Sequence, residues 1–350
     1  MRRFLKARYL IWLAVLLVVG WALSEAPLSQ IGETLRTLQP GQLAFLLLAN
    51  LFIFTLFSSR WWLILRAQGY KLPYLPLVGY RLAAFGISYF TPGTQFGGEP
   101  LQVYLLEKGQ RVPSSTALAA VSLDKLFELL ANFTFLLVGM ILILNGGLLP
   151  ALSSPVALVA AGALLGLPLA YLATLWFGAA PLTLAARVMP KRLYAHPRLG
   201  KLPALLGETE SQISHLFRRR PLALFWVLSV SGIVWLLMLA EYWLSLRFLG
   251  AEINLLQAII ALTAARLAFL TPLPGGLGAL EASQVLALEV FGFDPALGIS
   301  ISLLIRGRDV LFGSLGLWWG ALLTRRIATK AHWDPKLEAN AYSFIEIYDP

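Results

Sequence analysis

The chain has 350 residues, of which 58% are hydrophobic and only 13% are charged, and its mean hydropathy is +0.72. Because a soluble domain carries about 25% charged residues, these values exclude a water-soluble fold and predict an all-α polytopic membrane protein with a single membrane domain over 1–350. The net charge of +10 lies mostly between apolar runs, which is typical of membrane topology rather than of nucleic-acid binding. With no cysteine in the chain, disulfides and thiolate metal sites are excluded, and we expect no cofactor.

Long apolar runs mark the expected spanning helices. Each has about the twenty or more residues needed to cross the bilayer. The N-terminal run follows Arg2, Arg3, Lys6 and Arg8 and resembles a cleavable signal peptide, but its length and the spans after it favour an uncleaved first span. The sequence therefore predicts about six spans, at 9–24, 41–59, 116–144, 151–177, 221–249 and 296–323.

Two further apolar stretches, 77–107 and 255–291, are interrupted by segments rich in proline and glycine. The first contains Thr91-Pro-Gly-Thr-Gln-Phe-Gly-Gly-Glu-Pro100 and the second Thr271-Pro-Leu-Pro-Gly-Gly-Leu-Gly278. Proline removes a backbone donor and glycine weakens helix propagation, and irregular backbone at membrane depth must be buried in protein or face water. We therefore predict two re-entrant helical hairpins with these segments at their tips.

The positions of basic residues set the expected orientation, because cytoplasmic connections are enriched in lysine and arginine. Both termini, the cationic connection 178–220 and the tail 324–350 are predicted to be cytoplasmic, in the plasma (inner) membrane. Arg60 is assigned to the cytoplasmic connection after the second span, and 178–220 is expected to contain an amphipathic helix in the membrane interface. Eight full spans are the alternative, but the cationic connection 108–115 fits them less well.

The two predicted hairpins share an ordered set of residues: Arg-Leu-Ala, Thr-Pro, Gly-Gly and Glu. Glu99 precedes Asp124 by 25 positions (124 − 99 = 25), and Glu281 precedes Arg306 by the same number (306 − 281 = 25). We therefore predict an internal repeat of inverted topology, with halves at 41–177 and 221–323, and such repeats place a transporter's site at their interface.

Charged residues inside the predicted spans give the candidate site. Asp124 and Glu128 share one helix face, and Arg306 and Asp309 are spaced to pair locally. Each unpaired charge near the midplane costs on the order of 3 kcal/mol, so pairing or a hydrated cavity is expected. The N-termini of helices that follow the Gly-Gly turns, together with nearby arginines, are suited to bind an anionic phosphate. The candidate substrate-binding residues are Arg81, Gly97, Gly98, Glu99, Asp124, Lys125, Glu128, Arg266, Pro274, Gly275, Gly276, Glu281, Arg306 and Asp309.

Structural explanations compete with this functional one. Buried ion pairs can serve only to fix helix packing, Arg81 and Arg266 can extend toward an interface, and the glycines can permit close helix contacts. Glu241 and Arg247, near one end of their helix, are predicted to form an interfacial pair.

Three segments resemble the membrane domain of lysylphosphatidylglycerol synthetase/flippase proteins. They are Phe90-Thr-Pro-Gly…Gly-Gly-Glu99, Val121-Ser-Leu-Asp-Lys-Leu-Phe-Glu128 and Thr271-Pro-Leu-Pro-Gly-Gly-Leu-Gly-Ala-Leu-Glu281. The resemblance covers roughly residues 10–325 and implies movement of a phospholipid or lipid-linked molecule between leaflets. Where the family often has Glu-Arg, this chain has Asp124-Lys125, and the soluble aminoacyl-transfer domain of fused members is not expected here.

The expected function is therefore a flippase-like transporter rather than an enzyme, with membrane lipids, anionic or zwitterionic, as partners and no nucleic acid. Two alternatives remain open at this point: a membrane-embedded enzyme that modifies a lipid or polyprenyl phosphate, and a non-catalytic membrane scaffold. An enzyme would leave a new covalent product, whereas a transporter returns its lipid unchanged.

Overall fold

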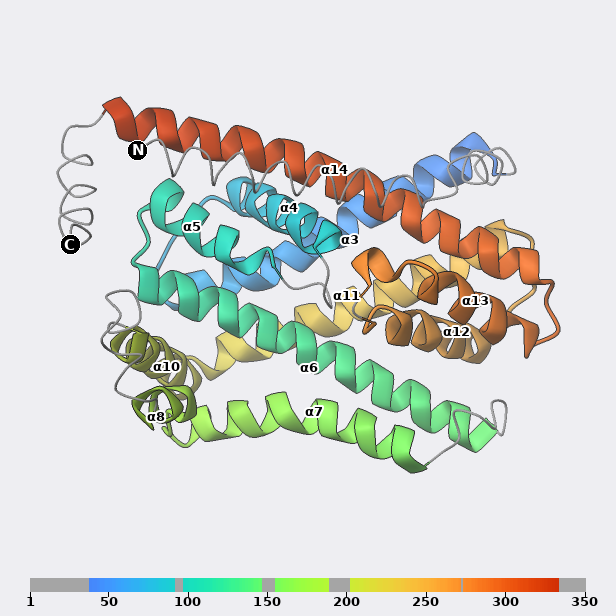
Figure 1. Cartoon of the computed structure of the whole chain (residues 1–350), viewed down its shortest axis with the longest axis horizontal. Helices are drawn as coiled ribbons and strands as arrows, with labels where there is room; N and C mark the ends of the chain where they lie inside the picture. Colours follow the sequence, from blue (N-terminus) through green and yellow to red (C-terminus); the bar gives the residue numbers. More distant parts are fainter. Residues whose placement is uncertain (1–37, 92–96, 147–154, 189–201, 272, 334–350) are drawn as a thin grey trace.

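The computed structural model describes residues 38–91, 97–146, 155–188, 202–271 and 273–333. Within these residues the fold is all-helical (Figure 1). The helices are α3 (Pro40–Ala67), α4 (Tyr74–Phe90), α5 (Glu99–Gln110), α6 (Ser114–Gly146), α7 (Pro155–Trp176), α8 (Pro181–Val188), α10 (Leu202–Arg219), α11 (Pro221–Phe248), α12 (Leu255–Ala268), α13 (Ala279–Glu289) and α14 (Pro295–Trp333), with a 3-10 turn at Pro274–Gly276.

Four helices in the described part are long and apolar enough to cross a membrane: Pro40–Ala67, Ser114–Asn145, Val159–Trp176 and Pro221–Phe248. They confirm four of the predicted spanning helices. The predicted helix 296–323 lies within α14, which runs for 39 residues and is not among these four. The predicted span 9–24 lies outside the described residues.

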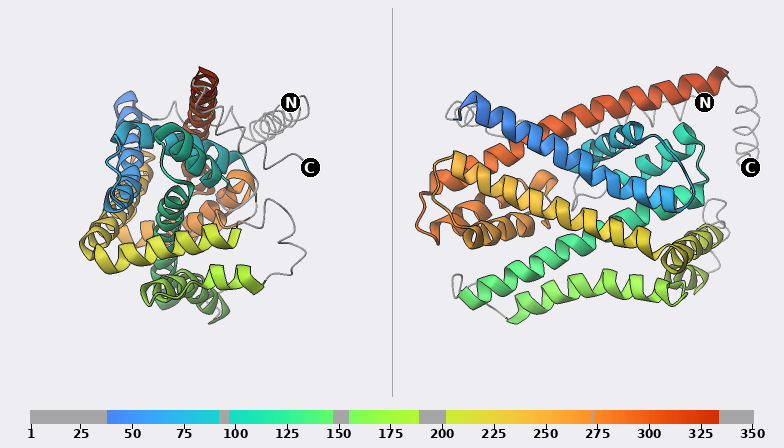
Figure 2. Two further views of the ribbon diagram at one scale, coloured as in Figure 1. Left: turned by 90° about the vertical axis from the view of Figure 1, so that its left-hand side faces the viewer. Right: turned by 180° about the vertical axis from the view of Figure 1, so that it is seen from behind.

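The long helices lie side by side along the longest axis of the molecule, and the shorter α4, α5, α12 and α13 pack among them (Figures 1 and 2). Two separate hydrophobic cores result. One is centred on Trp61, Leu77 and Leu105, and the other on Leu246 and Leu288.

The connection 178–220 contains α8 and α10, so the amphipathic helix forms, but its apolar face is covered by protein. Ile213, Leu216 and Phe217 are buried in the first core. Glu210 on the same helix accepts hydrogen bonds from the backbone amides of Leu182 and Thr183, each at 2.9 Å. The helix is therefore docked on the bundle, where its apolar face contacts protein instead of lipid.

The same local structure occurs twice along the chain, 181 residues apart (243 − 62 = 181). The indole of Trp62 donates to the Leu72 carbonyl at 3.0 Å, and that of Trp243 donates to the Ile253 carbonyl at 2.8 Å. Both helices concerned, α3 and α11, have 28 residues and begin with proline.

The ends of these two helices match as well. Gly69 and Gly250 follow them with φ of 94° and 88°, a left-handed conformation that favours glycine. The two helices run in opposite directions, because the ring of Phe45 near the start of α3 meets that of Phe248 at the end of α11, with centroids 6.1 Å apart. The two helices therefore lie antiparallel and side by side on one face of the bundle (Figure 2).

Candidate functional site

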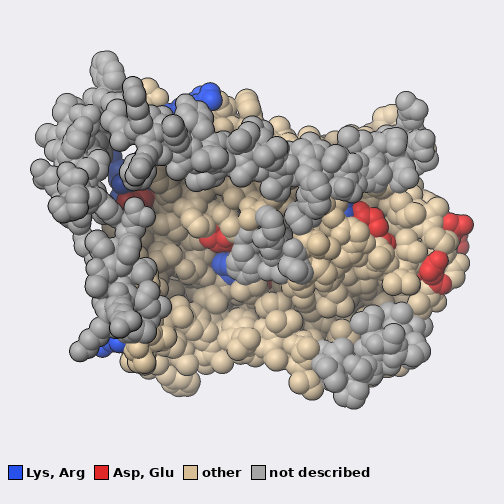
Figure 3. Space-filling view, in the orientation of Figure 1, with Lys and Arg blue, Asp and Glu red and all other residues tan. Residues whose placement is uncertain are grey.

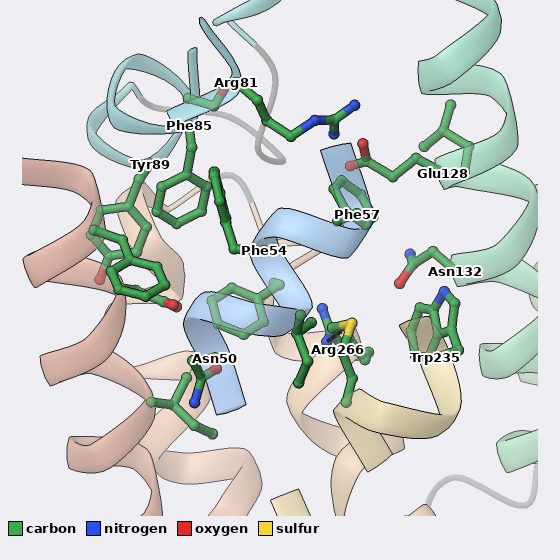
Figure 4. A pocket seen from close by; sticks show the side chains of 18 of the residues that line it. Asn50, Phe54, Phe57, Arg81, Phe85, Tyr89, Glu128, Asn132, Trp235 and Arg266 are labelled. Atoms are coloured by element: carbon green, nitrogen blue, oxygen red, sulfur yellow. Dashed lines mark hydrogen bonds between the residues drawn. The ribbon is translucent and has the colours of Figure 1, made fainter. Parts of the chain in front are cut away.

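A cavity of about 310 Å³ lies between α3, α4, α6, α11, α12 and α14 (Figure 4). Much of its wall is aromatic, with Phe54, Phe57, Phe85 and Trp235 among the lining residues. Half of the fourteen candidate residues line it: Arg81, Glu99, Asp124, Lys125, Glu128, Arg266 and Asp309. The structure thus brings residues from both halves of the sequence to one cavity.

The first group of charges is centred on Asp124 of α6. This buried carboxylate accepts from Arg60 Nε at 2.7 Å and from Arg81 Nη2. The guanidinium carbons of Arg60 and Arg81 each lie 4.5 Å from the centroid of the Phe57 ring. The assignment of Arg60 to a cytoplasmic connection was wrong, because α3 continues to Ala67 and carries Arg60 into the interior. The proposed extension of Arg81 toward an interface is also wrong.

Lys125 joins α5 to α6 beside this group. Its ammonium lies 2.9 Å from Glu128 Oε1 and 3.2 Å from Glu99 Oε1. Glu128 is also 3.7 Å from Arg60 Nη2. Six side chains therefore form one connected network with three positive and three negative formal charges: Arg60, Arg81, Lys125, Glu99, Asp124 and Glu128.

A second group lies across the cavity, around Arg308 of α14. Its Nε donates to Asp309 Oδ1 at 2.8 Å, and its Nη1 donates to Asn50 Oδ1 at 3.0 Å and lies 3.7 Å from Glu241 Oε2. Asn50 Nδ2 in turn donates to Glu241 Oε1 at 2.9 Å. This group links α3, α11 and α14 at the cavity wall.

These contacts correct two predicted pairings. Arg306 does not pair with Asp309, because its Nε donates to Glu281 Oε1 at 2.7 Å, on α13. Glu241 does not pair with Arg247, whose guanidinium carbon instead lies 5.2 Å from the ring centroid of Trp243. In both cases spacing along one helix was a poor guide, because the nearest opposite charge came from a neighbouring helix.

Arg266 differs from the other cations that line the cavity. Arg81, Lys125 and Arg308 each have a carboxylate partner, whereas Arg266 has none within ion-pair distance among the described residues. Its guanidinium carbon lies 4.9 Å from the Trp235 ring centroid, and Trp235 stacks on Phe135. Its Nε has no hydrogen-bond partner in the described structure. The side chain therefore stays in the cavity wall, and the expectation that it extends to an interface was wrong.

The turn residues among the candidates are not among those that line the cavity. The Gly97 amide donates to Glu99 Oε2 at 2.8 Å and the Gly98 amide to Ser88 Oγ at 2.9 Å. A Cβ on Gly98 would lie 2.1 Å from the Ala84 carbonyl oxygen, so this glycine permits close packing. Pro274 begins the 3-10 turn, in which Gly275 and Gly276 have positive φ of 56° and 65°. Glu281 and Arg306 also lie outside the cavity lining.

Sequence reasoning missed four residues that belong to this constellation: Asn50, Arg60, Glu241 and Arg308. A signal for two of them was present. Residues 60–69 and 241–250 share Trp, Leu, Leu, Arg and Gly at the same places, with Arg60 and Glu241 at the start of each segment. Because Glu241 lies within the predicted span 221–249, aligning these segments would have placed Arg60 inside a helix as well.

The long apolar helices define a multi-pass membrane protein, with a charged cavity between them. The chain belongs to the family of the lysylphosphatidylglycerol synthase TM region, whose model matches residues 8–316. It is 25% identical over 307 residues to a UPF0104 membrane protein of Methanothermobacter thermautotrophicus, covering 84% of this chain and 90% of that one. A UPF0104 membrane protein of Pyrococcus horikoshii is 22% identical over 309 residues, covering 83% and 88%. No solved structure matches the chain significantly.

Proposed function

We propose that the protein moves a phospholipid or lipid-linked molecule between the two leaflets, with its polar headgroup in the charged cavity. The observation that carries this proposal is Arg266, a cation in the cavity wall with no carboxylate partner among the described residues. A guanidinium held on an aromatic face in a cavity wall binds phosphate well, because its donors match phosphate oxygens.

The other charges suit a site that is emptied and refilled. In the group around Asp124 and in the group around Arg308, acidic and basic side chains pair with one another. The protein is therefore stable when the cavity holds no ligand. An entering headgroup places its phosphate at Arg266, and a cationic group of the same headgroup would take the place of Lys125 at Glu128 (Figure 4). Arg266 is better placed for the phosphate than Arg306, because Arg306 is engaged by Glu281 and does not line the cavity.

The proposal includes an inverted repeat with two re-entrant hairpins, α4–α5 and α12–α13. Its support is the recurrence of local structure 181 residues apart (243 − 62) in antiparallel α3 and α11. The packing is also exchanged between halves: α4 packs on α14, and α12 packs on α6. Antiparallel repeats with broken helices form the central site of many transporters, and here the cavity lies between them.

The orientation we propose places both termini and the connection 178–220 in the cytoplasm. Exposed basic residues gather at the end of the bundle that contains α8 and the end of α5, including Lys71, Lys108 and Arg187. The opposite end, near α12 and α13, exposes acidic side chains (Figure 3), including Glu252 and Asp294. An excess of lysine and arginine marks the cytoplasmic side.

The test is leaflet exchange of fluorescent phospholipids in liposomes that contain the purified protein. We expect exchange above that of empty liposomes, and its loss in Arg266→Gln. Arg247→Gln is the matched control, because Arg247 also lies over a tryptophan ring but outside the cavity. Mass spectra of the lipids before and after the assay distinguish translocation from chemical modification. Equal exchange by Arg266→Gln and the wild type would contradict the proposal.

A further inference from the structure

A second cavity of about 480 Å³ opens beside the charged one, between α3, α11 and α14. Its lining is mainly aliphatic, with Leu46, Leu47 and Leu311 among the lining residues. Leu47 and Leu311 are 38% and 43% exposed, so this side of the cavity lies on the surface of two helices that would face lipid. The cavity therefore has an apolar mouth on the outer wall of the bundle.

Its inner end is polar and is shared with the charged cavity. Asn50, Glu241, Tyr242, Ile305 and Arg308 line both spaces. The two cavities thus meet at the hydrogen-bonded group of Asn50, Glu241 and Arg308. The lining changes from charged to aliphatic across this group. It therefore suits an amphipathic molecule whose polar part lies in the charged cavity and whose hydrocarbon lies in the second cavity.

We infer that the second cavity is a binding site for one acyl chain of the lipid whose headgroup occupies the charged cavity. This inference rests on the proposed function. The lining is mainly aliphatic, and its charged residues, Glu241 and Arg308, lie where it meets the charged space, which is the polarity pattern of a lipid.

The size of the cavity favours a hydrocarbon chain over a helix. A spanning helix about 10 Å across and 30 Å long occupies roughly 2,400 Å³, more than a cavity with a volume of about 480 Å³ encloses. A flexible hydrocarbon chain one methylene wide can enter from the side that Leu47 and Leu311 line.

The arrangement also explains how a lipid's two parts remain in suitable surroundings. Hydrocarbon transferred from lipid to the leucine-lined cavity stays in an apolar medium, while the headgroup exchanges water for fixed charges and hydrogen bonds. Arg308 is placed at the junction, where the polar part of the lipid joins its chains. The site therefore selects for molecules that carry both an acyl chain and an anionic or zwitterionic head.

The experiment uses a phospholipid with a photoreactive diazirine near the end of one acyl chain, reconstituted with the full chain in liposomes. After illumination, adducts are mapped by mass spectrometry. We expect them at 43–47 and 301–314, in excess of adducts at exposed Leu228 and Leu236 of α11, which serve as the reference for ordinary surrounding lipid. Even labelling of all lipid-facing helices would overturn the inference, because it indicates surrounding lipid only.

Two substitutions supply the matched control. Leu311 lines the second cavity and Leu315 does not, although they are 43% and 44% exposed on the same helix. Leu311→Trp fills the cavity and should lower the adducts in it at least about fivefold, while Leu315→Trp leaves them unchanged. Leu47→Trp and Leu48→Trp form a second such pair on α3. Unchanged labelling in both cavity-filling variants overturns the inference, as does cross-linking of a cysteine at 311 to the segment 9–24.

The outcome separates this inference from the proposed function. Selective labelling of the second cavity without leaflet exchange would support the acyl-chain site and contradict translocation. Leaflet exchange without selective labelling would support translocation and contradict this site.

Discussion

Arg60 of α3 and Glu241 of α11 carry opposite charges and stand 181 positions apart (241 − 60). Each contacts a long helix that follows later in the sequence: Arg60 binds Asp124 of α6, and Glu241 lies 3.7 Å from Arg308 of α14. Both charges are thus compensated by a neighbouring helix, as the interior of a membrane protein requires.

Removing the charge of Asp124 should destabilise the protein strongly. In Asp124→Asn, Arg60 and Arg81 remain buried without their shared counter-ion, and breaking a buried pair in this way costs about 3–5 kcal/mol. Thermal unfolding in detergent, followed by tryptophan fluorescence, measures the loss.

The control for this loss is Glu107→Gln. Glu107 pairs with Lys108, whose side chain is 52% exposed, and such surface pairs contribute about 0–1 kcal/mol. A similar melting temperature for Asp124→Asn and Glu107→Gln would contradict the buried network.

Adding one methyl group at Gly316 should disrupt the contact between α4 and α14. A Cβ there would lie 2.1 Å from the Leu82 carbonyl oxygen, and overpacking of this kind costs about 1–3 kcal/mol. Gly162→Ala is the matched substitution, because nothing lies within 4 Å of its Cβ and alanine favours a helix by up to about 1 kcal/mol. We expect a lower melting temperature only in Gly316→Ala; the reverse order would contradict the described packing.

The proposed orientation predicts which sites are reachable from outside the cell. The chain has no cysteine, so single-cysteine variants are labelled without background. A membrane-impermeant maleimide should label Glu252→Cys in intact cells and should label Lys108→Cys only after the membrane is opened. Both residues are exposed, so labelling of Lys108→Cys in intact cells would contradict the orientation.

Apolar periodicity and helix breakers located most described helices, because span length and Pro/Gly interruptions are local properties of the sequence. The midplane charges Asp124, Lys125, Glu128 and Asp309 were also found in this way, and they line the cavity. Ion-pair partners on other helices were missed. Asp124 pairs with Arg60, and Arg306 pairs with Glu281. Such pairings depend on packing between segments that are distant in the sequence. The positive-inside rule assigned Arg60 to a cytoplasmic connection, although it lies within α3.

The phosphate-binding role first given to the glycine turns shows a second limit. A glycine pair before a helix is typical of an anion site and equally of a tight turn or a close contact. Gly98 packs against the Ala84 carbonyl, and its amide already binds Ser88. Only three-dimensional contacts distinguish these roles.

The central claim, that lipid headgroups pass through the charged cavity, is tested most directly by reversible blocking of that cavity. Asn132 of α6 lines it, whereas Val138 of the same helix is 48% exposed and does not. Each is replaced by cysteine, modified with a bulky thiosulfonate, and assayed for leaflet exchange before and after reduction. We predict that modification stops exchange in Asn132→Cys, that reduction restores it, and that Val138→Cys is unaffected. Undiminished exchange in fully modified Asn132→Cys would contradict passage through this cavity.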